Sequence, residues 1–135
     1  MLASMCFAHL LAFGSSTHGT VAVAAAVWYS SSKPKHSNMS IIPLLVIAGP
    51  TASGKTEAAL RVAEALGGEI VSADSMQIYR DLDVGTAKPT ADERARAPFH
   101  LVDFVDPRAE YSVVEFQRDA REAIRDIHAR GRLPI

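Results

Sequence analysis

Apolar and polar positions change their spacing between Pro43 and Gly67. The continuous apolar run Leu44–Ala48, bounded by Pro43 and Gly49, is typical of a strand buried on both faces of a parallel sheet. In the segment 55–68 the spacing becomes helical, and Gly67 provides a C-terminal stop. The expected inward face of this helix consists of Ala59, Val62, Ala63 and Leu66.

The apolar segment 69–73 is short and rich in β-branched side chains, so it predicts the return strand of a βαβ unit. From Asp74 to Pro98 the periodicity is lost, and polar residues with two prolines predict a mobile loop or a short lid. The segment 99–107 contains a further candidate for a short strand.

The segment 111–131 carries clear helix signals. Ser112 and Glu115 have the spacing of a capping box, and Tyr111 and Phe116 that of a hydrophobic staple. Gly131 is the expected end, and the segment 132–135 leads into another buried strand. The expected inward face of the helix consists of Phe116, Ala120, Ala123, Ile124 and Ile127.

The first 38 residues differ in composition from the rest. They contain no acidic residue, and their apolar stretches are interrupted before reaching the length of a membrane span. They also lack the positive n-region of a secretory signal and the arginines of a transit peptide. We therefore expect residues 1–38 to lie outside the fold, as sequence upstream of a start at Met39 or as a targeting-like extension.

The charge balance limits the partners of residues 39–135. Of the whole chain's charged residues, 12 basic and 15 acidic ones fall in this part, so it offers no electrostatic footprint for nucleic acid. The one cysteine, Cys6, excludes an internal disulfide and a zinc site built from cysteines.

The sequence GPTASGKT fits the pattern G-x-x-x-x-G-K-[ST] and stands between the predicted strand and the predicted helix. Its glycines let the backbone form a nest of N–H groups for phosphate, Lys55 would contact the terminal phosphates, and the Thr56 hydroxyl would bind Mg²⁺. The alternative is a glycine turn that binds nothing. The candidate phosphate-binding residues are Gly49, Pro50, Thr51, Ala52, Ser53, Gly54, Lys55 and Thr56.

These elements predict an α/β fold, a P-loop NTPase-like parallel sheet with flanking helices, truncated after about two to three strands. Residues 39–135 would be the N-terminal part of such a domain. A P-loop establishes a polyphosphate site but no reaction, because kinases, ATPases and other phosphate-handling enzymes share it.

Asp74 follows the second predicted strand, where ligands bind in open parallel sheets. An ionised carboxylate repels phosphate, so its expected role is to hold the other reactant as a general base or anchor. Ser75 and Gln77 add hydrogen-bonding groups, and a glutamine amide can read a base edge. The alternative is an aspartate that caps a turn or supports a magnesium ion indirectly.

GPTASGKT followed by SADSMQIYR, GTAKP and the pattern HLVD…DP…YS…F closely resembles the tRNA dimethylallyltransferases, also called tRNA isopentenyltransferases. The resemblance covers Pro43 to Ile135. It implies transfer of a dimethylallyl group from dimethylallyl diphosphate to the exocyclic amine of the adenosine 3′ to the anticodon. The implied enzyme is cytoplasmic and monomeric, with no membrane partner.

The resemblance also implies residue roles. Gly49 to Thr56 would bind the diphosphate with Mg²⁺ on Thr56, and Asp74, Lys55 and Thr56 would be the catalytic residues, with Asp74 as the base. The tRNA contact would be formed by Asp74, Ser75, Met76 and Gln77. The family continues after GRLPI with further substrate-binding and tRNA-binding parts, so we expect this chain alone to be weakly active or inactive.

Three other functions stay open from the residues. A small-molecule or nucleotide kinase also needs a P-loop and an acid after the second strand; an adenylate isopentenyltransferase prenylates the free nucleotide; and the chain could be a non-catalytic product. Lys88 and Arg80 are further candidates for phosphate contact. His100, Asp103 and Asp106 have the residue types of a metal site, although such residues near strand ends more often form caps and turns.

Overall fold

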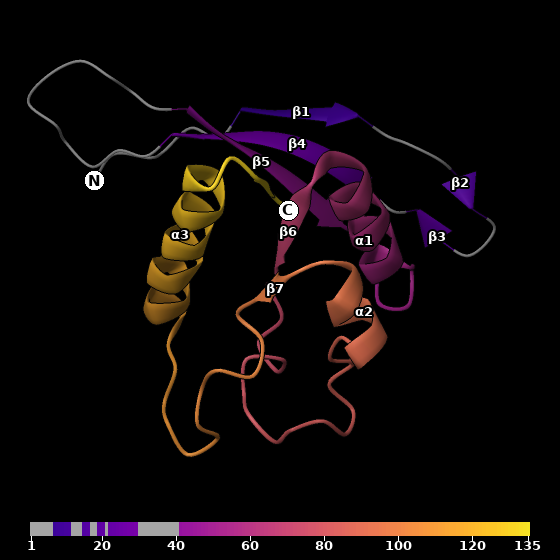
Figure 1. Ribbon diagram of the computed structural model, residues 1–135. Helices are drawn as coiled ribbons and strands as arrows, with labels where there is room; N and C mark the ends of the chain where they lie inside the picture. The colour runs from indigo at the N-terminus through magenta and orange to yellow at the C-terminus, as the bar shows by residue number, and fades with distance from the viewer. Residues whose placement is uncertain (1–6, 12–14, 17–18, 21, 30–40) are drawn as a thin grey trace, which may run out of the picture.

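The computed structural model describes residues 7–11, 15–16, 19–20, 22–29 and 41–135, with side chains from residue 42 onward. A parallel sheet holds the centre of the described part, and an antiparallel sheet lies beside it (Figure 1). The parallel sheet has the order β7 (Phe99–His100), β6 (Gly68–Val71), β8 (Leu133–Pro134). The antiparallel sheet has the order β1 (Phe7–Leu11), β4 (Ala22–Tyr29), β5 (Ile41–Ala48). A small hairpin joins β2 (Ser15–Ser16) to β3 (Gly19–Thr20).

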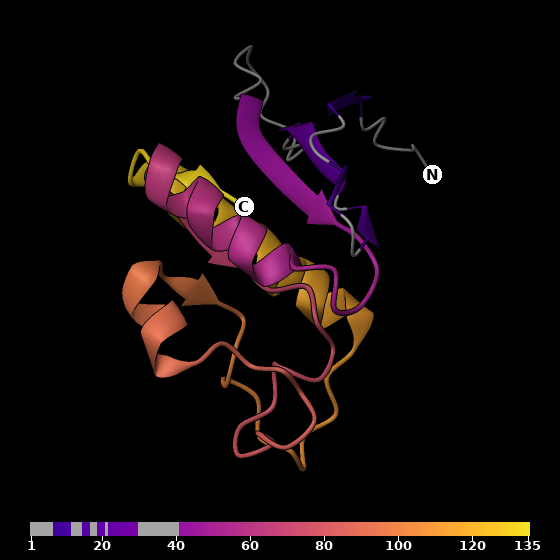
Figure 2. The same ribbon diagram turned by 90° about the vertical axis from the view of Figure 1, so that its right-hand side faces the viewer.

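Two long helices cover opposite faces of the parallel sheet, as the views in Figures 1 and 2 agree. Helix α1 (Lys55–Leu66) follows β5, and α3 (Val113–Ala129) precedes β8. Both helices and the parallel pairing of β6 with β7 and β8 confirm the expected α/β architecture. Within the described part, no helix is long and apolar enough to cross a bilayer.

Strand β5 differs from its prediction in length and in burial. It begins at Ile41 and runs through Pro43, which was expected to precede it. Of its described side chains only Ile42 is buried, and Val46 is exposed, whereas burial on both faces was expected. The physical reason is that β5 is not hydrogen-bonded to the parallel sheet, so its side chains border a cavity instead of neighbouring strands.

Strand β4 pairs with the whole of β5, from Tyr29 opposite Ile41 to Ala22 opposite Ala48. This pairing occupies the backbone N–H and C=O groups along one edge of β5, and among the described residues no strand pairs with its other edge. Residues 22–29 therefore lie against the fold in the structure, whereas we expected residues 1–38 to lie outside it. Residues 1–6, 12–14, 17–18, 21 and 30–38 fall outside the described residues, and the domain assignment of 1–38 stays a prediction.

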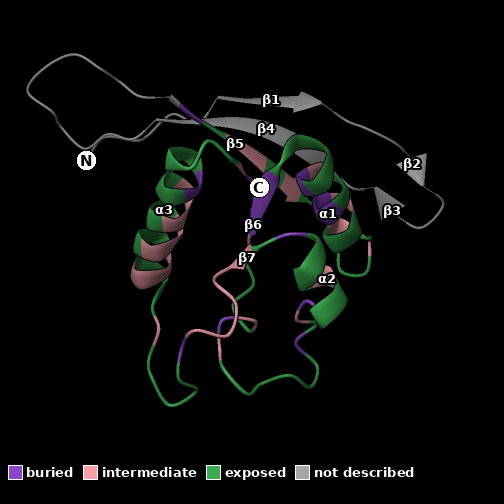
Figure 3. Ribbon diagram, viewed as in Figure 1, coloured by how far each residue is buried: buried purple, intermediate pink, exposed green. Residues whose placement is uncertain are grey.

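The core forms where α1 packs on β6 and β8. Leu60 has no exposed surface, and it lies with Ala59, Ala63, Ile70 and Ile135 in one cluster. The helical period correctly predicted Ala59 and Ala63. It was wrong at Leu66, which is 61% exposed, and it missed Leu60. Figure 3 shows the buried side of α1 turned toward β6.

Helix α1 ends as predicted. The Gly67 N–H donates to the carbonyl of Ala63, and Gly67 adopts a left-handed conformation that glycine tolerates best. Gly68 allows a close approach of β8, because a Cβ there would lie 2.6 Å from Ile135 Cδ1 and 2.9 Å from the Leu133 carbonyl oxygen.

Helix α3 has the predicted capping box, with both hydrogen bonds between Ser112 and Glu115 present. Its predicted apolar face does turn inward, but only Ile127 is fully buried. Phe116, Ala120 and Ile124 stay half-buried because they border the cavity beside β5.

Helix α2 (Ala91–Arg96) interrupts the segment that was predicted to be a loop. Thr90 and Glu93 form its capping box. The signal was present in the sequence as T-x-x-E but was not followed by the apolar run that usually identifies a helix. Its C-terminal Arg96 pairs with Glu57 and Glu64, which fixes α2 against α1.

Glu69 is a buried acid at the end of the parallel sheet that lies away from the glycine loop. Its Oε2 accepts hydrogen bonds from His100 Nε2 and Arg130 at 2.6 Å each, and Arg132 lies 3.4 Å from Oε1. Burial alone would raise the pKa of Glu69, but the bonds from Arg130 and His100 outweigh it and hold the pKa below its usual range. The charged form of Glu69 therefore ties α3 and β7 to β6.

We expect this carboxyl to make the protein less stable in acid. A folded pKa below the unfolded value means that the stabilisation is present above about pH 4.3 and is lost as the pH falls through the folded pKa. Thermal melts between pH 7 and pH 3 should show a smaller acid loss for Glu69→Gln than for the wild type. Glu122→Gln, at an exposed position of α3, is the matched control, and an equal acid loss in all three proteins would contradict the prediction.

Candidate functional site

The glycine loop joins β5 to α1 with the backbone turned sharply inward. Ala52 and Gly54 have φ values of 62° and 84°, and the Ser53 N–H donates to the Pro50 carbonyl at 3.3 Å. Left-handed residues alternating with right-handed ones turn successive N–H groups toward the same point, which is the geometry of an anion nest. Of the two glycines of the motif only Gly54 adopts a positive φ, and Ala52 is the second left-handed residue of the loop, which the glycine pattern did not predict.

The N-terminus of α1 has no side-chain cap, in contrast to those of α2 and α3, the other helices in the described part of the chain. The first N–H groups of a helix have no intrahelical acceptor, and α1 offers none from a side chain. In α2 and α3 a capping box satisfies such groups. The free N–H groups of α1, with the positive end of its dipole, are suited to bind phosphate oxygens.

Two side chains of the loop fit the same purpose. Lys55 folds back and donates from Nζ to the Pro50 carbonyl at 2.6 Å, which holds its ammonium group over the loop. The Ser53 hydroxyl is buried without a hydrogen-bond partner among the described residues. A buried hydroxyl of this kind is costly unless something bonds to it, and a phosphate oxygen in the nest would do so.

Glu57, in the first turn of α1, would repel an anion if its charge were free. Its carboxylate instead accepts hydrogen bonds from Arg96 and Arg61 at 2.7 Å, and these bonds lower its pKa to about 2. The two guanidinium groups balance its charge, so the entrance to the nest is not dominated by an acid.

Asp74 lies exposed just beyond the end of β6, as predicted. Its Oδ1 accepts the N–H groups of Met76 at 2.8 Å and Gln77 at 3.4 Å, which closes an Asx turn. No hydrogen bond of the described residues uses Oδ2 as acceptor. The turn therefore fixes one carboxylate oxygen and leaves the other for a ligand, so the two interpretations of Asp74, turn former and reactive carboxylate, are compatible.

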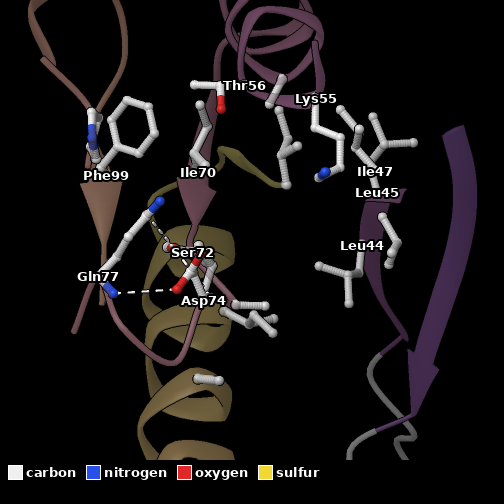
Figure 4. Close-up of a pocket in the computed structure, with 18 of the residues that line it drawn as sticks. Leu44, Leu45, Ile47, Lys55, Thr56, Ile70, Ser72, Asp74, Gln77 and Phe99 are labelled. Atoms are coloured by element: carbon white, nitrogen blue, oxygen red, sulfur yellow. Dashed lines mark hydrogen bonds between the residues drawn. The ribbon is translucent and has the colours of Figure 1, made fainter. Parts of the chain in front are cut away.

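A cavity of about 470 Å³ lies between β5 and β6, and Asp74, Lys55 and Thr56 all line it. In Figure 4 the side chain of Lys55 points into this space from α1, while Asp74 borders it from the end of β6. The remaining wall is mostly apolar. It includes Leu45, Ile47, Ile70, Phe99, Phe116 and Ile124. The site combines the uncapped N-terminus of α1, a carboxylate and an apolar space suited to a hydrocarbon group.

Gln77 is bonded inside the protein at both ends of its amide. Its Oε1 accepts the Ser72 hydroxyl at 2.9 Å, and its Nε2 donates to the Ala87 carbonyl at 2.9 Å. Sequence reasoning treated this amide as a reader of a base edge and gave Ser72 and Ala87 no role. The contact with Ala87 has no sequence signal, because Ala87 lies ten residues away in an irregular segment. The contact with Ser72 spans five residues and matches no local motif.

Lys88 was a candidate for phosphate contact, and the structure places it elsewhere. Its side chain is only 7% exposed, and its ammonium group lies 2.8 Å from Asp83 and 2.5 Å from Asp103. Asp103 also pairs with Arg94. Lys88 is therefore neutralised by two carboxylates, and Asp103 is occupied by two cations.

The residues named as a possible metal group do not come together. His100 bonds Glu69, Asp103 bonds Lys88 and Arg94, and Asp106 accepts the N–H of Arg108 in a turn. Among the described residues, no group of three or more histidine, cysteine or acidic side chains is placed to bind a metal ion.

Two family models match the chain in overlapping regions. The model described as isopentenyl transferase matches residues 42–97, and the model described as IPP transferase matches residues 77–135. Together they span the glycine loop, the Asp74 turn and α3.

Two named relatives are similar to this chain in sequence, and both are tRNA dimethylallyltransferases. The chain is 62% identical over 93 residues to the tRNA dimethylallyltransferase of Halorhodospira halophila and 56% identical over 93 residues to that of Thermomicrobium roseum. Each match covers 69% of this chain, but only 30% and 28% of the relative. The chain thus spans less than a third of the length of these relatives.

Solved structures give the same result. The tRNA isopentenylpyrophosphate transferase of Bacillus halodurans matches with a TM-score of 0.61 and 52% identity, over 63% of this chain and 28% of that one. A eukaryotic dimethylallyltransferase described as acting on tRNA matches with a TM-score of 0.60 and 38% identity, over 63% of this chain and 21% of that one.

Proposed function

The chain belongs to the tRNA isopentenyltransferase family, and from this premise we propose that it provides the diphosphate-binding loop and the general base of a tRNA dimethylallyltransferase. The observation that carries the proposal is that Lys55 and Asp74 line the same cavity. A P-loop kinase would share the loop, but the apolar wall beside it suits a five-carbon hydrocarbon group better than a hydrophilic acceptor.

In the proposed reaction, the bond between the dimethylallyl carbon and the diphosphate oxygen breaks, and a bond forms from that carbon to the exocyclic nitrogen of adenosine. The amine proton passes to Asp74, and the diphosphate leaves with the electron pair of the broken bond. The N–H groups of the loop and the Lys55 ammonium stabilise the negative charge that grows on the diphosphate. The amine nitrogen gains positive charge as it attacks the carbon, and Asp74 stabilises that charge by accepting the amine proton.

We propose Mg²⁺ as the metal ion, held by the Thr56 hydroxyl together with diphosphate oxygens and water. The residues fit such an ion: Thr56 lines the cavity next to Lys55, and Mg²⁺ commonly uses few protein ligands beside phosphates. When bound, the ion would neutralise part of the diphosphate charge.

The proposed partners are tRNA and dimethylallyl diphosphate. Asp74 lines the cavity, and Asp74, Ser75 and Met76 are all exposed, so these three residues can meet the anticodon loop directly. The 74–77 segment carries no basic residue, so affinity for the tRNA backbone has to come from other parts of the enzyme. We further propose a monomer that works in the cytoplasm.

The test is a chimaera in which residues 42–135 replace the matching segment of the Halorhodospira halophila relative. This chimaera should prenylate an anticodon stem-loop with dimethylallyl diphosphate and should not transfer the γ-phosphoryl group of ATP. Mass spectrometry of the RNA and labelled ATP measure the two activities. Phosphoryl transfer without prenylation would overturn the proposal in favour of a kinase.

Lys55→Met should weaken binding of dimethylallyl diphosphate by the chain about 10- to 100-fold, because a hydrogen bond to a charged group contributes about 1.5–3 kcal/mol. Methionine keeps the unbranched apolar stem and removes only the charge. Titration calorimetry measures the change. Arg118→Met, which removes an exposed cation of α3 that pairs with Asp119, should leave the affinity unchanged, and equal losses in both variants would show a general charge effect.

A further inference from the structure

The loop Gly85–Pro89 forms one wall of the cavity and belongs to no helix or strand. Ala87 and Pro89 line the cavity beside Asp74 and Gln77. Gly85 and Ala87 have φ values of 79° and 47°, and the second is a conformation that alanine rarely adopts. A segment in such a conformation persists only when surrounding contacts hold it.

Those contacts form a closed ring of four residues. The Gln77 side chain donates to the Ala87 carbonyl at 2.9 Å, and the next residue, Lys88, places its ammonium group 2.5 Å from Asp103. The Asp103 N–H donates back to the Gln77 carbonyl at 3.0 Å. The ring therefore starts and ends at Gln77, and two of its members, Gln77 and Ala87, line the cavity.

Gln77 also belongs to the turn that holds Asp74. Its N–H donates to Asp74 Oδ1, and its amide oxygen is fixed by the Ser72 hydroxyl at the end of β6. The residue directly after it, Ile78, is 4% exposed and accepts the N–H groups of Phe104 and Val105. Gln77 thus contacts the carboxylate through its backbone N–H, and the strand end and the Ala87 wall through its side chain.

We propose that Gln77 is a positioning residue, which sets the distance between the Asp74 turn and the Gly85–Pro89 wall of the cavity. The importance of that distance for catalysis rests on the proposed function, but the link itself does not. Both ends of the Gln77 amide are used for this link, so Asp74, Ser75 and Met76 meet the tRNA, and Gln77 acts through them.

Gln77→Glu tests the link in the chain without any substrate. Glutamate keeps the shape and can still accept from Ser72, but it cannot donate to the Ala87 carbonyl. Hydrogen exchange measured by mass spectrometry should become about 2- to 10-fold faster at residues 84–88, the factor expected from losing one hydrogen bond. Exchange in α1 and α3 should not change.

Gln117→Glu is the matched control, because it makes the same substitution at an exposed position on α3. It should leave exchange at residues 84–88 unaltered. Unchanged exchange there in Gln77→Glu would overturn the proposal. Ser72→Ala is the second variant if Gln77→Glu loses its folded circular dichroism signal. It removes the donor to the Gln77 amide oxygen and the longer 3.4 Å bond from the Asp74 N–H. It must accelerate exchange at the same residues, and a failure to do so would also overturn the proposal.

The chimaera separates positioning from substrate reading. A positioning role predicts that Gln77→Glu lowers kcat while the Kd of the anticodon stem-loop stays within twofold of the wild type. A weaker stem-loop affinity with unchanged exchange at residues 84–88 would make Gln77 a substrate contact and would overturn the proposal. If the chimaera with Gln77 unchanged fails to prenylate the stem-loop, the proposed function is refuted. The positioning role of Gln77 is not refuted by that result, because the exchange experiment uses no substrate.

Discussion

Asp74→Asn is expected to lower the turnover of the chimaera by about 10²- to 10⁴-fold, the usual contribution of a general base. Asparagine cannot take the amine proton, but its side-chain oxygen can still accept the N–H groups of Met76 and Gln77 and preserve the turn. The loss should therefore appear in kcat, measured as prenylated stem-loop per enzyme. The affinity for dimethylallyl diphosphate should remain, because the loop and α1 hold the diphosphate.

Asp81→Asn is the control for this change. Asp81 is also exposed and has a positive φ of 58°, a conformation that asparagine accepts well. Its turnover should match the wild type. If Asp74→Asn retains full turnover, Asp74 is a turn former and the base must be sought elsewhere.

Leu60→Ala is expected to destabilise the chain by about 2–5 kcal/mol, because Leu60 has no exposed surface and alanine would leave a cavity between α1 and the sheet. Against a typical total of about 5–15 kcal/mol, this is a large part of the free energy of unfolding. Urea unfolding followed by circular dichroism measures the change.

Leu66→Ala makes the same substitution six residues later on the same helix. Leu66 is 61% exposed, so its loss should change the free energy of unfolding by less than about 0.5 kcal/mol. The two variants share their effect on helix propensity, and the difference between them reports burial alone. Similar losses at both positions would mean that α1 packs through another face.

The comparison of Leu60 with Leu66 also shows where sequence reasoning stops. The ends of α1 and α3 were predicted correctly because glycines and a capping box are local signals. The buried face of α1 was shifted, because two possible apolar stripes share Ala59 and Ala63 and only the position of the sheet decides between them. The half-buried face of α3 likewise depends on a cavity that no local pattern encodes.

The residues of the site also fall into those that the sequence predicts and those that it does not. The loop residues and Asp74 could be identified because a glycine pattern and an acid after a strand are read along the chain. The partners of Gln77 and Lys88 could not, because Ala87 and Asp103 approach them only after an irregular segment has folded. The sequence thus predicted Lys88 as a cation available to phosphate, whereas in the structure two carboxylates neutralise it.

The central claim is that the diphosphate loop and the Asp74 turn face one shared cavity, and nuclear magnetic resonance can test it on the chain itself. Titration with dimethylallyl diphosphate should shift the amide signals of residues 49–56 and of residues 72–77 with the same dissociation constant. Inorganic diphosphate should shift mainly residues 49–56. If dimethylallyl diphosphate shifts residues 49–56 while residues 72–77 do not respond at saturation, the two segments do not share a site and the account is wrong.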